Sequence, residues 1–360
     1  MVGQVQSFSV EGYRSVQNLH VTFDVVNLIT GPNGCGKTNL FNAFRLIKAA
    51  TEGRIGKALA EEGGLASILW AGSRGGAQPT VGVSLVAEPF EYRLELGIRP
   101  ASELPLFPLD PQIKNEVVKL AGKVMVDRKS SIAHMSSVGG RRHLRTDLLD
   151  SESIFAQIGD PEEFSYLYNL REMVARWAFY HEFRTDADSP LRRPALATYS
   201  SRLADDGSNL GPILYIIQRQ GDRDALDRIL ETAFPGTKVV TDYGQFSMEV
   251  DGIHRTIEPR EFSDGTLKFL CLAAICFGTR PPPLIALNEP ETSLNPNLLE
   301  PLADMLTYAS AFSQLWITTH SEDLSRHLVN RIDCRPIRLD KVGGKTIRAG
   351  RPNSAWSIED

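Results

Sequence analysis

The sequence predicts an α/β protein with two lobes, the first built on a mixed, largely antiparallel sheet and the second on a parallel sheet. Three observations support this prediction. Short segments near the N-terminus, such as VQSFSV and HVTFDV, alternate with the period of two that half-buried strands show. A glycine-rich loop joins the buried run VVNLIT to a helical pattern ending near residue 50. From about residue 207, helical segments alternate with short apolar strands, as in parallel sheets covered by helices.

Length and composition limit the class of protein. The chain has 360 residues, a formal net charge of -5 and 23% charged residues, which suits one large two-lobed globular domain. No apolar run reaches the roughly 18 residues of a membrane span, and the N-terminal segment lacks the features of a secretory signal. The four cysteines show no CxxC pairing or metal-like spacing with histidine. We therefore expect a cytoplasmic protein without a membrane partner.

The first lobe is expected over residues 1–200. Its helix after the glycine-rich loop is followed by a loop-rich connection over residues 53–79. Further strands are predicted at VGVSLVAE and YRLELGI, and EVVKLAGKVMVD predicts a hairpin that turns at Ala121-Gly122. A helix is expected over residues 161–178, opened by Pro161, and a short strand over 179–183.

The second lobe is expected over residues 205–360. Helices are predicted near 209–220, 222–233 and 264–277, and from 297 and 321; strands are predicted at 238–242, 246–250, LIALNE, LWITTH and in two closing segments. The chain shows no internal repeat and no sustained heptad pattern, so long coiled-coil arms are not expected.

The segment Gly31–Thr38, GPNGCGKT, matches the pattern G-x-x-x-x-G-K-[ST] and stands between a buried strand and a helix, where that pattern binds phosphate. Glycines let backbone N–H groups turn around phosphate oxygens, and the helix N-terminus adds partial positive charge. Lys37 is expected to reach the β- and γ-phosphates, and the Thr38 hydroxyl to ligate Mg²⁺. The residues expected to bind the nucleotide are Asn33, Gly34, Cys35, Gly36, Lys37 and Thr38.

Two later strands end in residues suited to hydrolysis. LIALN is followed by Glu289, and a carboxylate at the C-terminal tip of a strand faces the crevice where α/β folds bind ligands. Glu289 can polarise or deprotonate a water that attacks the γ-phosphate. LWITT is followed by His320, 31 residues after Glu289, which can sense the γ-phosphate or orient that water. An incidental acidic turn and an ordinary surface histidine are the alternatives.

Ser263 precedes the helical pattern LKFLCLAAICF, where it can act as the N-cap, and the nearby Gly265 leaves the helix N-terminus open to an anion. Taken alone, this segment predicts only a helix cap.

In order and type, these motifs resemble ABC-type ATPase heads of the SMC/RecF/OLD-like branch of bacterial AAA family ATPases. The resemblance covers residues 1–50 and 205–340. The matching segments are Gly31–Thr38 for Walker A, Ser263–Thr266 for the signature motif, Leu284–Glu289 for Walker B, Ser293–Pro296 for the D-loop, Thr319–Ser321 for the switch histidine, and Gly12–Ser15 beside the adenine.

The resemblance implies a P-loop NTPase of ABC-head type, without coiled-coil arms and without the C-terminal nuclease domain of OLD-type proteins. It also implies ATP and Mg²⁺ as cofactors, Arg14 as a further nucleotide contact, and a homodimer that encloses two nucleotides. In such a dimer, Ser263 and Gly265 of one subunit face the γ-phosphate held by the other, and hydrolysis through Glu289 resets the pair.

The sequence departs from this family pattern at two positions. Asn288 stands where the family usually has Asp; its amide can accept a hydrogen bond from a Mg²⁺-bound water but brings no charge, so slow turnover is expected. The Q-loop glutamine has no clear counterpart, and His181, Arg184 or Asp186 stand near its expected place.

A basic stretch over residues 117–146 carries a local charge of about +6. DNA contact through it is one interpretation, and a solvated hairpin edge protected by charge is the other. The residues proposed for DNA contact are Lys123, Lys129, Arg141, Arg142 and Arg145.

Three classes of function remain open at this point. The first is an ATPase in DNA repair or maintenance, similar to RecF. The second is an ATP-dependent sensor or scaffold that controls a separately encoded effector, as in phage-defence systems. The third, a transporter ATPase subunit, is disfavoured because the SDGT form resembles the SMC-like branch and because the insertion in the first lobe is large.

Overall fold

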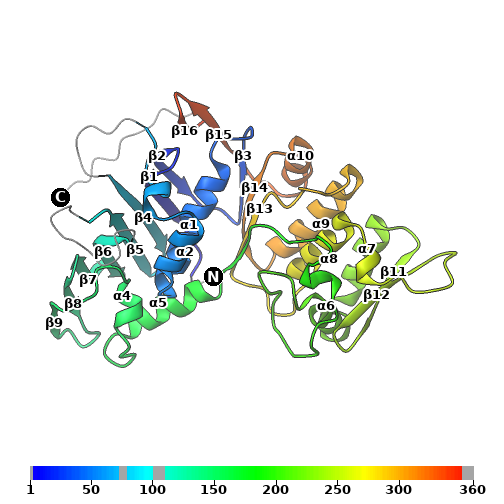
Figure 1. Ribbon diagram of the computed structural model, residues 1–360, viewed down its shortest axis with the longest axis horizontal. Helices are drawn as coiled ribbons and strands as arrows, with labels where there is room; N and C mark the ends of the chain where they lie inside the picture. Colours follow the sequence, from blue (N-terminus) through cyan, green and yellow to red (C-terminus); the bar gives the residue numbers. More distant parts are fainter. Residues whose placement is uncertain (1–2, 73–78, 100–109, 351–360) are drawn as a thin grey trace. The chain divides into compact units, whose positions relative to one another are not determined.

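The computed structural model describes residues 3–72, 79–99 and 110–350 (Figure 1). The chain divides into two compact units. Unit 1 comprises residues 1–24, 31–177 and 337–360, and unit 2 comprises residues 25–30 and 178–336. Each unit therefore draws on segments that are distant in sequence.

Unit 1 is built on an eight-stranded antiparallel sheet with the order β2-β1-β4-β5-β6-β7-β8-β9. Side chains alternate between a buried and a more exposed face, most clearly in β5 and β8. The strands are β1 Ser7–Tyr13, β2 Val16–Thr22, β4 Thr80–Ala87, β5 Phe90–Gly97, β6 Gln112–Leu120, β7 Lys123–Lys129, β8 Ile132–Ser136 and β9 Arg142–Arg145.

Helices and a C-terminal hairpin complete unit 1. Helix α1 (Lys37–Thr51) packs on β1 and β4, and α5 (Ser165–Ala175) packs against α1 (Figure 1). In the core, the rings of Phe8 and Trp177 lie 5.0 and 5.6 Å from that of Phe44. The remaining elements are α2 Ile55–Glu61, α3 Leu65–Ile68, α4 Ile154–Gln157, and the hairpin of β15 Ile337–Val342 and β16 Lys345–Arg348, which lies beside β2.

Unit 2 contains a parallel sheet in which β10 (Ala178–Tyr180), β13 (Leu284–Asn288), β14 (Gln314–Thr319) and β3 (Val26–Thr30) are neighbours in that order. Every residue of β13 and β14 is buried, as expected for strands covered on both faces. Helices α9 (Leu299–Ser310) and α10 (Glu322–Arg331) pack on β14 (Figure 1). Helix α8 (Asp264–Cys276) packs on α9 and on α6 (Leu210–Gln220).

The other bounds in unit 2 follow the predicted segments closely. The helices are α6 Leu210–Gln220, α7 Arg223–Ala233, α8 Asp264–Cys276, α9 Leu299–Ser310 and α10 Glu322–Arg331, with short 3-10 turns η1 Pro190–Arg192, η2 Pro259–Glu261 and η3 Pro296–Leu298. A separate two-stranded sheet joins β11 Thr237–Asp242 and β12 Gln245–Val250.

The predicted fold class, α/β with one antiparallel and one parallel region, is confirmed. The unit boundaries differ from the predicted lobes in two ways. Strand β3 and residues 178–204, predicted in the first lobe, belong to unit 2, and the closing hairpin, predicted in the second lobe, belongs to unit 1. Helices α2 and α3 occupy part of the predicted loop, and β8 and β9 fall where no strands were predicted.

The helix predicted to begin at Pro161 begins instead at Ser165. The side chain of Asp160 accepts from the N–H groups of Glu162 and Glu163, and its carbonyl accepts from that of Phe164. These bonds stabilise a turn before the helix.

Within the ranges that the structure describes, no helix combines the length and the apolar character needed to cross a membrane.

Candidate nucleotide-binding and hydrolytic site

The phosphate-binding loop of unit 1 is formed mainly by backbone. Gly31, Gly34 and Gly36 have φ values of 152°, 77° and 108°, which glycine adopts without a side-chain clash. Gly36 is the N-cap of α1, and as a glycine it has no side chain that could cap the first turn of that helix. Uncapped N–H groups at a helix N-terminus form an anion site, so this geometry fits a nucleotide phosphate.

Lys37 places its charge inside the loop. Its Nζ donates hydrogen bonds to the carbonyl oxygens of Gly31, at 2.8 Å, and Pro32, at 3.2 Å, and the residue is buried. Thr38 is the second residue of α1 and is half-buried, while Asn33 and Gly34 are exposed at the tip. These positions suit the roles predicted for a Walker A loop.

The C-terminal hairpin supports this loop, a feature that sequence reasoning missed. Thr346 Oγ1 donates to the carbonyl of Cys35 at 2.7 Å, and the Thr346 N–H donates to that of Ser15 at 2.8 Å. A Cβ on Gly36 would lie 2.1 Å from Thr346 Oγ1, and one on Gly31 would lie 2.4 Å from the carbonyl oxygen of Leu339. Gly31 and Gly36 are therefore required for close packing as well as for their φ values.

Arg14, predicted beside the adenine, lies in the turn between β1 and β2 with φ of 46°. Its guanidinium is 2.9 Å from the carboxylate of Glu62, which also accepts from the Tyr13 hydroxyl at 2.6 Å. Burial and the neighbouring Glu62 carboxylate raise the pKa of Tyr13 well above its ordinary value. Arg14 is thus held by partners within unit 1, and its contact with nucleotide stays a prediction.

In unit 2, the tips of three parallel strands lie at one edge of the sheet. Asn288 of β13 is in register with Thr318 of β14, and Thr319 of β14 with Thr30 of β3. The next residue after Thr30 is Gly31, so the phosphate-binding loop begins at the edge where the strand of Glu289 also ends.

Glu289 follows β13 in a strained backbone conformation. Its φ is +47°, a region that residues with a Cβ rarely adopt, and its N–H donates to the carbonyl of Thr318 at 2.9 Å. Such strain persists only where surrounding contacts fix it, and it is often found at functional sites.

Asn288, predicted to assist Mg²⁺ binding, is buried and accepts a 2.7 Å hydrogen bond from the Thr318 hydroxyl through Oδ1. A carbonyl oxygen has two lone pairs, so one remains for a metal-bound water. The structure therefore fits the predicted role with less acceptor capacity than a carboxylate would give.

His320 lies between two carboxylates. Its Nδ1 is 3.5 Å from Glu289 Oε2 and 3.2 Å from Glu291 Oε1, and its side chain is 40% exposed. Glu291 is the functional residue that sequence reasoning missed, although its position two residues after Glu289 was visible.

The carboxylate of Glu291 organises the tip of β14. Its Oε1 accepts from the Thr319 hydroxyl at 2.6 Å and from the N–H groups of His320 and Ser321 at 3.0 and 3.3 Å. Its Oε2 is buried without a hydrogen-bond partner among the described residues. Glu291 therefore fixes both the backbone and the ring that carry the predicted switch histidine.

Lys268 of α8 joins the signature helix to the residues after β13. Its Nζ donates to the carbonyls of Thr292, at 2.7 Å, and Glu289, at 3.2 Å. Desolvation lowers the pKa of this buried lysine, while the nearby carboxylate of Glu291 opposes that shift. A Cβ on Gly265 would lie 2.9 Å from the Ser293 carbonyl, so Gly265 permits the close approach of α8 to this segment.

Ser263 is the N-cap of α8, as predicted: its Oγ accepts from the N–H of Thr266 at 3.1 Å, and the residue is exposed. Arg192 holds the preceding turn by donating to the carbonyls of Pro259, Arg260 and Phe262 and to the carboxylate of Asp264, at 2.7–3.2 Å. The cap therefore stands on a fixed backbone.

Two of the three possible Q-loop substitutes, Arg184 and Asp186, bind each other, and the role of His181 stays a prediction. Arg184 and Asp186 form a doubly hydrogen-bonded pair with each other on the surface. This pair raises the pKa of the Arg184 guanidinium and lowers that of the Asp186 carboxyl.

The basic stretch of unit 1 is less uniform than the sequence suggested. Arg128 is fully buried, where it pairs with Glu116 at 3.0 Å and donates to three backbone carbonyls. Arg145 pairs with Asp147, and Arg141 lies 3.8 Å from Glu163. The five residues proposed for DNA contact are exposed, and their contact with DNA stays a prediction.

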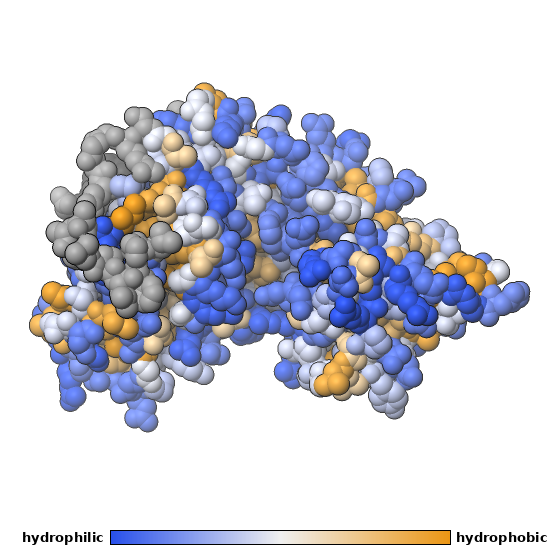
Figure 2. All heavy atoms as spheres, in the orientation of Figure 1, coloured by the Kyte–Doolittle hydropathy of each residue, from blue (hydrophilic) through white to orange (hydrophobic). Residues whose placement is uncertain are grey.

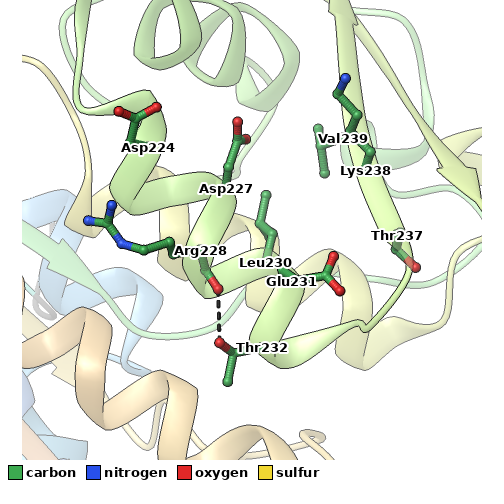
Figure 3. A pocket seen from close by; sticks show the side chains of 9 residues that line it. All are labelled: Asp224, Asp227, Arg228, Leu230, Glu231, Thr232, Thr237, Lys238 and Val239. Atoms are coloured by element: carbon green, nitrogen blue, oxygen red, sulfur yellow. Dashed lines mark hydrogen bonds between the residues drawn. The ribbon is translucent and has the colours of Figure 1, made fainter.

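A pocket between α7 and β11 contains none of the predicted site residues. Figure 3 shows Asp224, Asp227 and Glu231 along α7 and Lys238 on the neighbouring β11, with the Thr232 hydroxyl donating to the carbonyl of Arg228. Its lining is an open surface of mixed charge, which lacks the convergent donors of a phosphate site.

Solved structures with a similar fold are heads of SMC proteins. One is an Smc head bound to the C-winged helix domain of ScpA, with a TM-score of 0.53, 14% identity and coverage of 96% of this chain and 97% of that one. Another is an Smc head with an extended coiled coil bound to the C-terminal domain of ScpA from Pyrococcus furiosus, with a TM-score of 0.51, 16% identity and coverage of 96% and 95%. The predicted ABC-head fold is confirmed. No curated protein matches the chain.

Two family models match the sequence. An "AAA domain" model matches residues 7–62, which contain the phosphate-binding loop. The model described as "AAA domain, putative AbiEii toxin, Type IV TA system" matches residues 127–325, more than half of the chain. The chain therefore belongs to this AbiEii-type family of AAA domains.

Proposed function

We propose that the protein binds ATP with Mg²⁺ through Gly31–Thr38 and hydrolyses it with Glu289 as the residue that activates water. The observation that carries this proposal is the shared sheet edge: the register of β3, β14 and β13 brings Thr30, Thr319 and Asn288 to one side. Walker A glycines with positive φ and uncapped helical N–H groups then supply phosphate donors.

Within this proposal, each residue has a distinct task. Lys37 and Thr38 hold the phosphates and the metal, and Asn288 accepts from a metal-bound water. His320 orients the attacking water, with its ring fixed by Glu291. Because the γ-phosphate carries much negative charge, positioning and electrostatic stabilisation supply most of the rate gain.

The same proposal includes an ATP-dependent homodimer. Ser263 and Gly265 begin an exposed helix N-terminus whose preceding turn is held by Arg192. An exposed anion site on a rigid support suits a phosphate presented by a second subunit. ATP would then stabilise the dimer by mass action, and hydrolysis would release it.

The test is a mass measurement by light scattering, with and without ATP and Mg²⁺, on Glu289→Gln and on Glu289→Gln combined with Ser263→Arg. We expect dimers with ATP for the first variant and monomers for the second, while both bind ATP. A dimer that ignores ATP, or that survives Ser263→Arg, would contradict the sandwich arrangement.

Two cellular roles fit this chemistry. DNA repair or maintenance is the first, and control of a separately encoded effector in phage defence is the second. The description of the matched family as an AbiEii-type toxin of a type IV system favours the second role. Hydrolysis that rises with duplex DNA would support the first role; hydrolysis that ignores DNA would support the second.

A further inference from the structure

Strand β9 of unit 1 has an open edge. It pairs with β8 on one side, and it ends the eight-stranded sheet in the part of the chain that the structure describes. Ser137 donates its N–H to the carbonyl of Arg141 at 2.8 Å where the β8–β9 hairpin closes. In an antiparallel ladder, hydrogen-bonded pairs such as Ser137–Arg141 alternate with pairs that are not hydrogen-bonded. Arg142 and Leu144 belong to the second kind, so their N–H and C=O groups point away from β8. This edge can accept another strand.

Aliphatic side chains flank the open edge. The register places Ile132, Leu144, Lys129 and Arg142 on one face of the sheet, together with Asp127 and His134, and all six are exposed. Ile132 and Leu144 are 46% and 59% exposed. Figure 2 shows hydrophobic and hydrophilic residues interspersed at this end of unit 1. The face therefore combines apolar and charged groups, and its outermost strand presents Leu144 and Arg142.

The charge at this edge is positive although the chain as a whole is negative. The exposed basic residues are Lys123, Lys129, Arg141, Arg142 and Arg145. Their printed acidic partners, Asp147 and Glu163, form exposed or partly exposed pairs, which interact weakly in water. The edge therefore favours a negatively charged ligand.

We propose that β9 is the docking edge for an extended segment of a partner protein that carries an aliphatic and an acidic side chain two residues apart, and therefore on the same face. Backbone hydrogen bonds to Arg142 and Leu144 would supply affinity, as in other cases of strand addition. The aliphatic side chain of the segment would lie beside Leu144, and its carboxylate would lie beside Arg142.

Nucleic acid fits this edge less well. Arg145 pairs in register with the buried Ala133 and so lies on the opposite face from Arg142, which prevents the basic residues from forming one stripe. Phosphates would also lie against Ile132 and Leu144, which gain nothing from a charged partner.

A second copy of β9 fits less well too. Pairing two copies would bring two positively charged edges together, and like charges close to one another are destabilising. The edge lies wholly within unit 1 and needs no nucleotide, so this inference goes beyond the proposed ATPase function.

The test uses the full chain and a fluorescein-labelled hexapeptide, Thr-Ile-Thr-Glu-Thr-Val, whose aliphatic and acidic side chains share one face of an extended strand; binding is followed by fluorescence anisotropy. Leu144→Pro removes an outward N–H without removing a bond to β8, because edge strands tolerate proline on their open side. Arg142→Glu reverses one charge and keeps the backbone intact. Leu196→Pro, at an 83% exposed leucine of unit 2, is the matched control.

We expect Leu144→Pro to weaken peptide binding about tenfold, because a backbone hydrogen bond is lost and strand pairing is interrupted. Arg142→Glu should weaken it several-fold, and Leu196→Pro should leave it unchanged. The peptide Thr-Ile-Thr-Lys-Thr-Val, which differs only in the charge of its fourth residue, should not bind.

The proposal would be overturned if the wild type did not bind the acidic peptide, or if Leu144→Pro and Arg142→Glu both bound it as tightly as the wild type does. It would also be overturned if a short DNA duplex bound more tightly and displaced the peptide. Melting temperatures of the variants establish that each is folded. If Leu144→Pro does not fold, the result for Arg142→Glu decides.

Discussion

The phosphate-binding loop of unit 1 is formed mainly by backbone groups, whereas the strand tips of unit 2 are held together mainly by side chains. In the loop, glycine backbone and a helix N-terminus supply the donors within one continuous segment, Gly31–Thr38. At the strand tips, hydrogen bonds join separate elements: Lys268 of α8 donates to the Thr292 carbonyl after β13, and the Thr318 and Thr319 hydroxyls of β14 donate to Asn288 and Glu291. Under the proposed function, ATP binding would depend on local backbone shape, whereas hydrolysis would depend on tertiary contacts.

The difference predicts two kinds of failure. A change that distorts the loop should abolish nucleotide binding and with it every later step. A change at the strand tips should spare binding and slow turnover, because those residues act on the water and the transition state. Four substitutions, taken from the largest expected effect to the smallest, test this division.

Gly36→Ala should have the largest effect. The new Cβ would meet Thr346 Oγ1 at 2.1 Å, and alanine is strained at φ of 108°. We expect the affinity for ATP to fall at least about a hundredfold, since the first-turn N–H groups would be displaced from the phosphates. Equilibrium binding of a fluorescent ATP analogue measures this.

Gly56→Ala is the matched control, because no heavy atom lies within 4 Å of a Cβ built there. Normal binding by Gly36→Ala would show that the C-terminal hairpin does not constrain the loop.

Lys268→Met should leave ATP binding intact and reduce turnover strongly. The substitution leaves the carbonyls of Glu289 and Thr292 without their donor, and hydrogen bonds from a charged group contribute about 1.5–3 kcal/mol. We expect kcat to fall tenfold or more at an unchanged KM, together with a lower melting temperature. Lys57→Met, at an exposed lysine of α2, should change neither value.

If Lys268→Met changed KM and left kcat unchanged, the lysine would contribute to nucleotide binding rather than to hydrolysis.

Glu291→Gln should have a smaller effect. The amide keeps an oxygen that can accept from Thr319 and from the backbone of His320, but it loses the charge beside the His320 ring. We expect kcat to fall about tenfold, as is typical when the orientation of an acid–base residue is lost. The pH profile of kcat should shift as well, which a purely structural defect would not produce.

An unchanged pH profile with a lower kcat would assign Glu291 a structural role only. Glu300→Gln, at an exposed carboxylate of α9, is the control.

Asn288→Asp should have the smallest effect and the opposite sign. A carboxylate can accept from Thr318 and still offer charge to Mg²⁺, which the amide cannot. We expect hydrolysis to accelerate several-fold and to saturate at lower Mg²⁺. An unchanged rate at every Mg²⁺ concentration would show that Asn288 does not limit turnover.

The same division explains what the sequence could predict. The loop is one continuous segment, so its glycines and Lys37 could be recognised from the sequence. The same holds for the apolar strands that end at Glu289 and His320. The roles of Lys268, Glu291 and Thr346 were not, because each acts through a partner distant in sequence: Thr346 lies 311 residues from Cys35. No local pattern encodes such contacts.

Strands β8 and β9 were missed for a different reason. Their residues alternate weakly, and β9 reads Arg-His-Leu-Arg, which as an isolated segment resembles a charged loop. Pairing with β7 and β8 makes them strands. Arg128 likewise counted as surface charge until the structure placed it beside Glu116 inside unit 1.

The central claim is that one half of the site binds ATP and the other half hydrolyses it. The most direct test measures ATP binding and steady-state phosphate release by the wild type and by Glu289→Gln in parallel. The account predicts equal binding by both proteins and turnover by the wild type only. Equal turnover by the two proteins, or the absence of ATP binding to either, would contradict it.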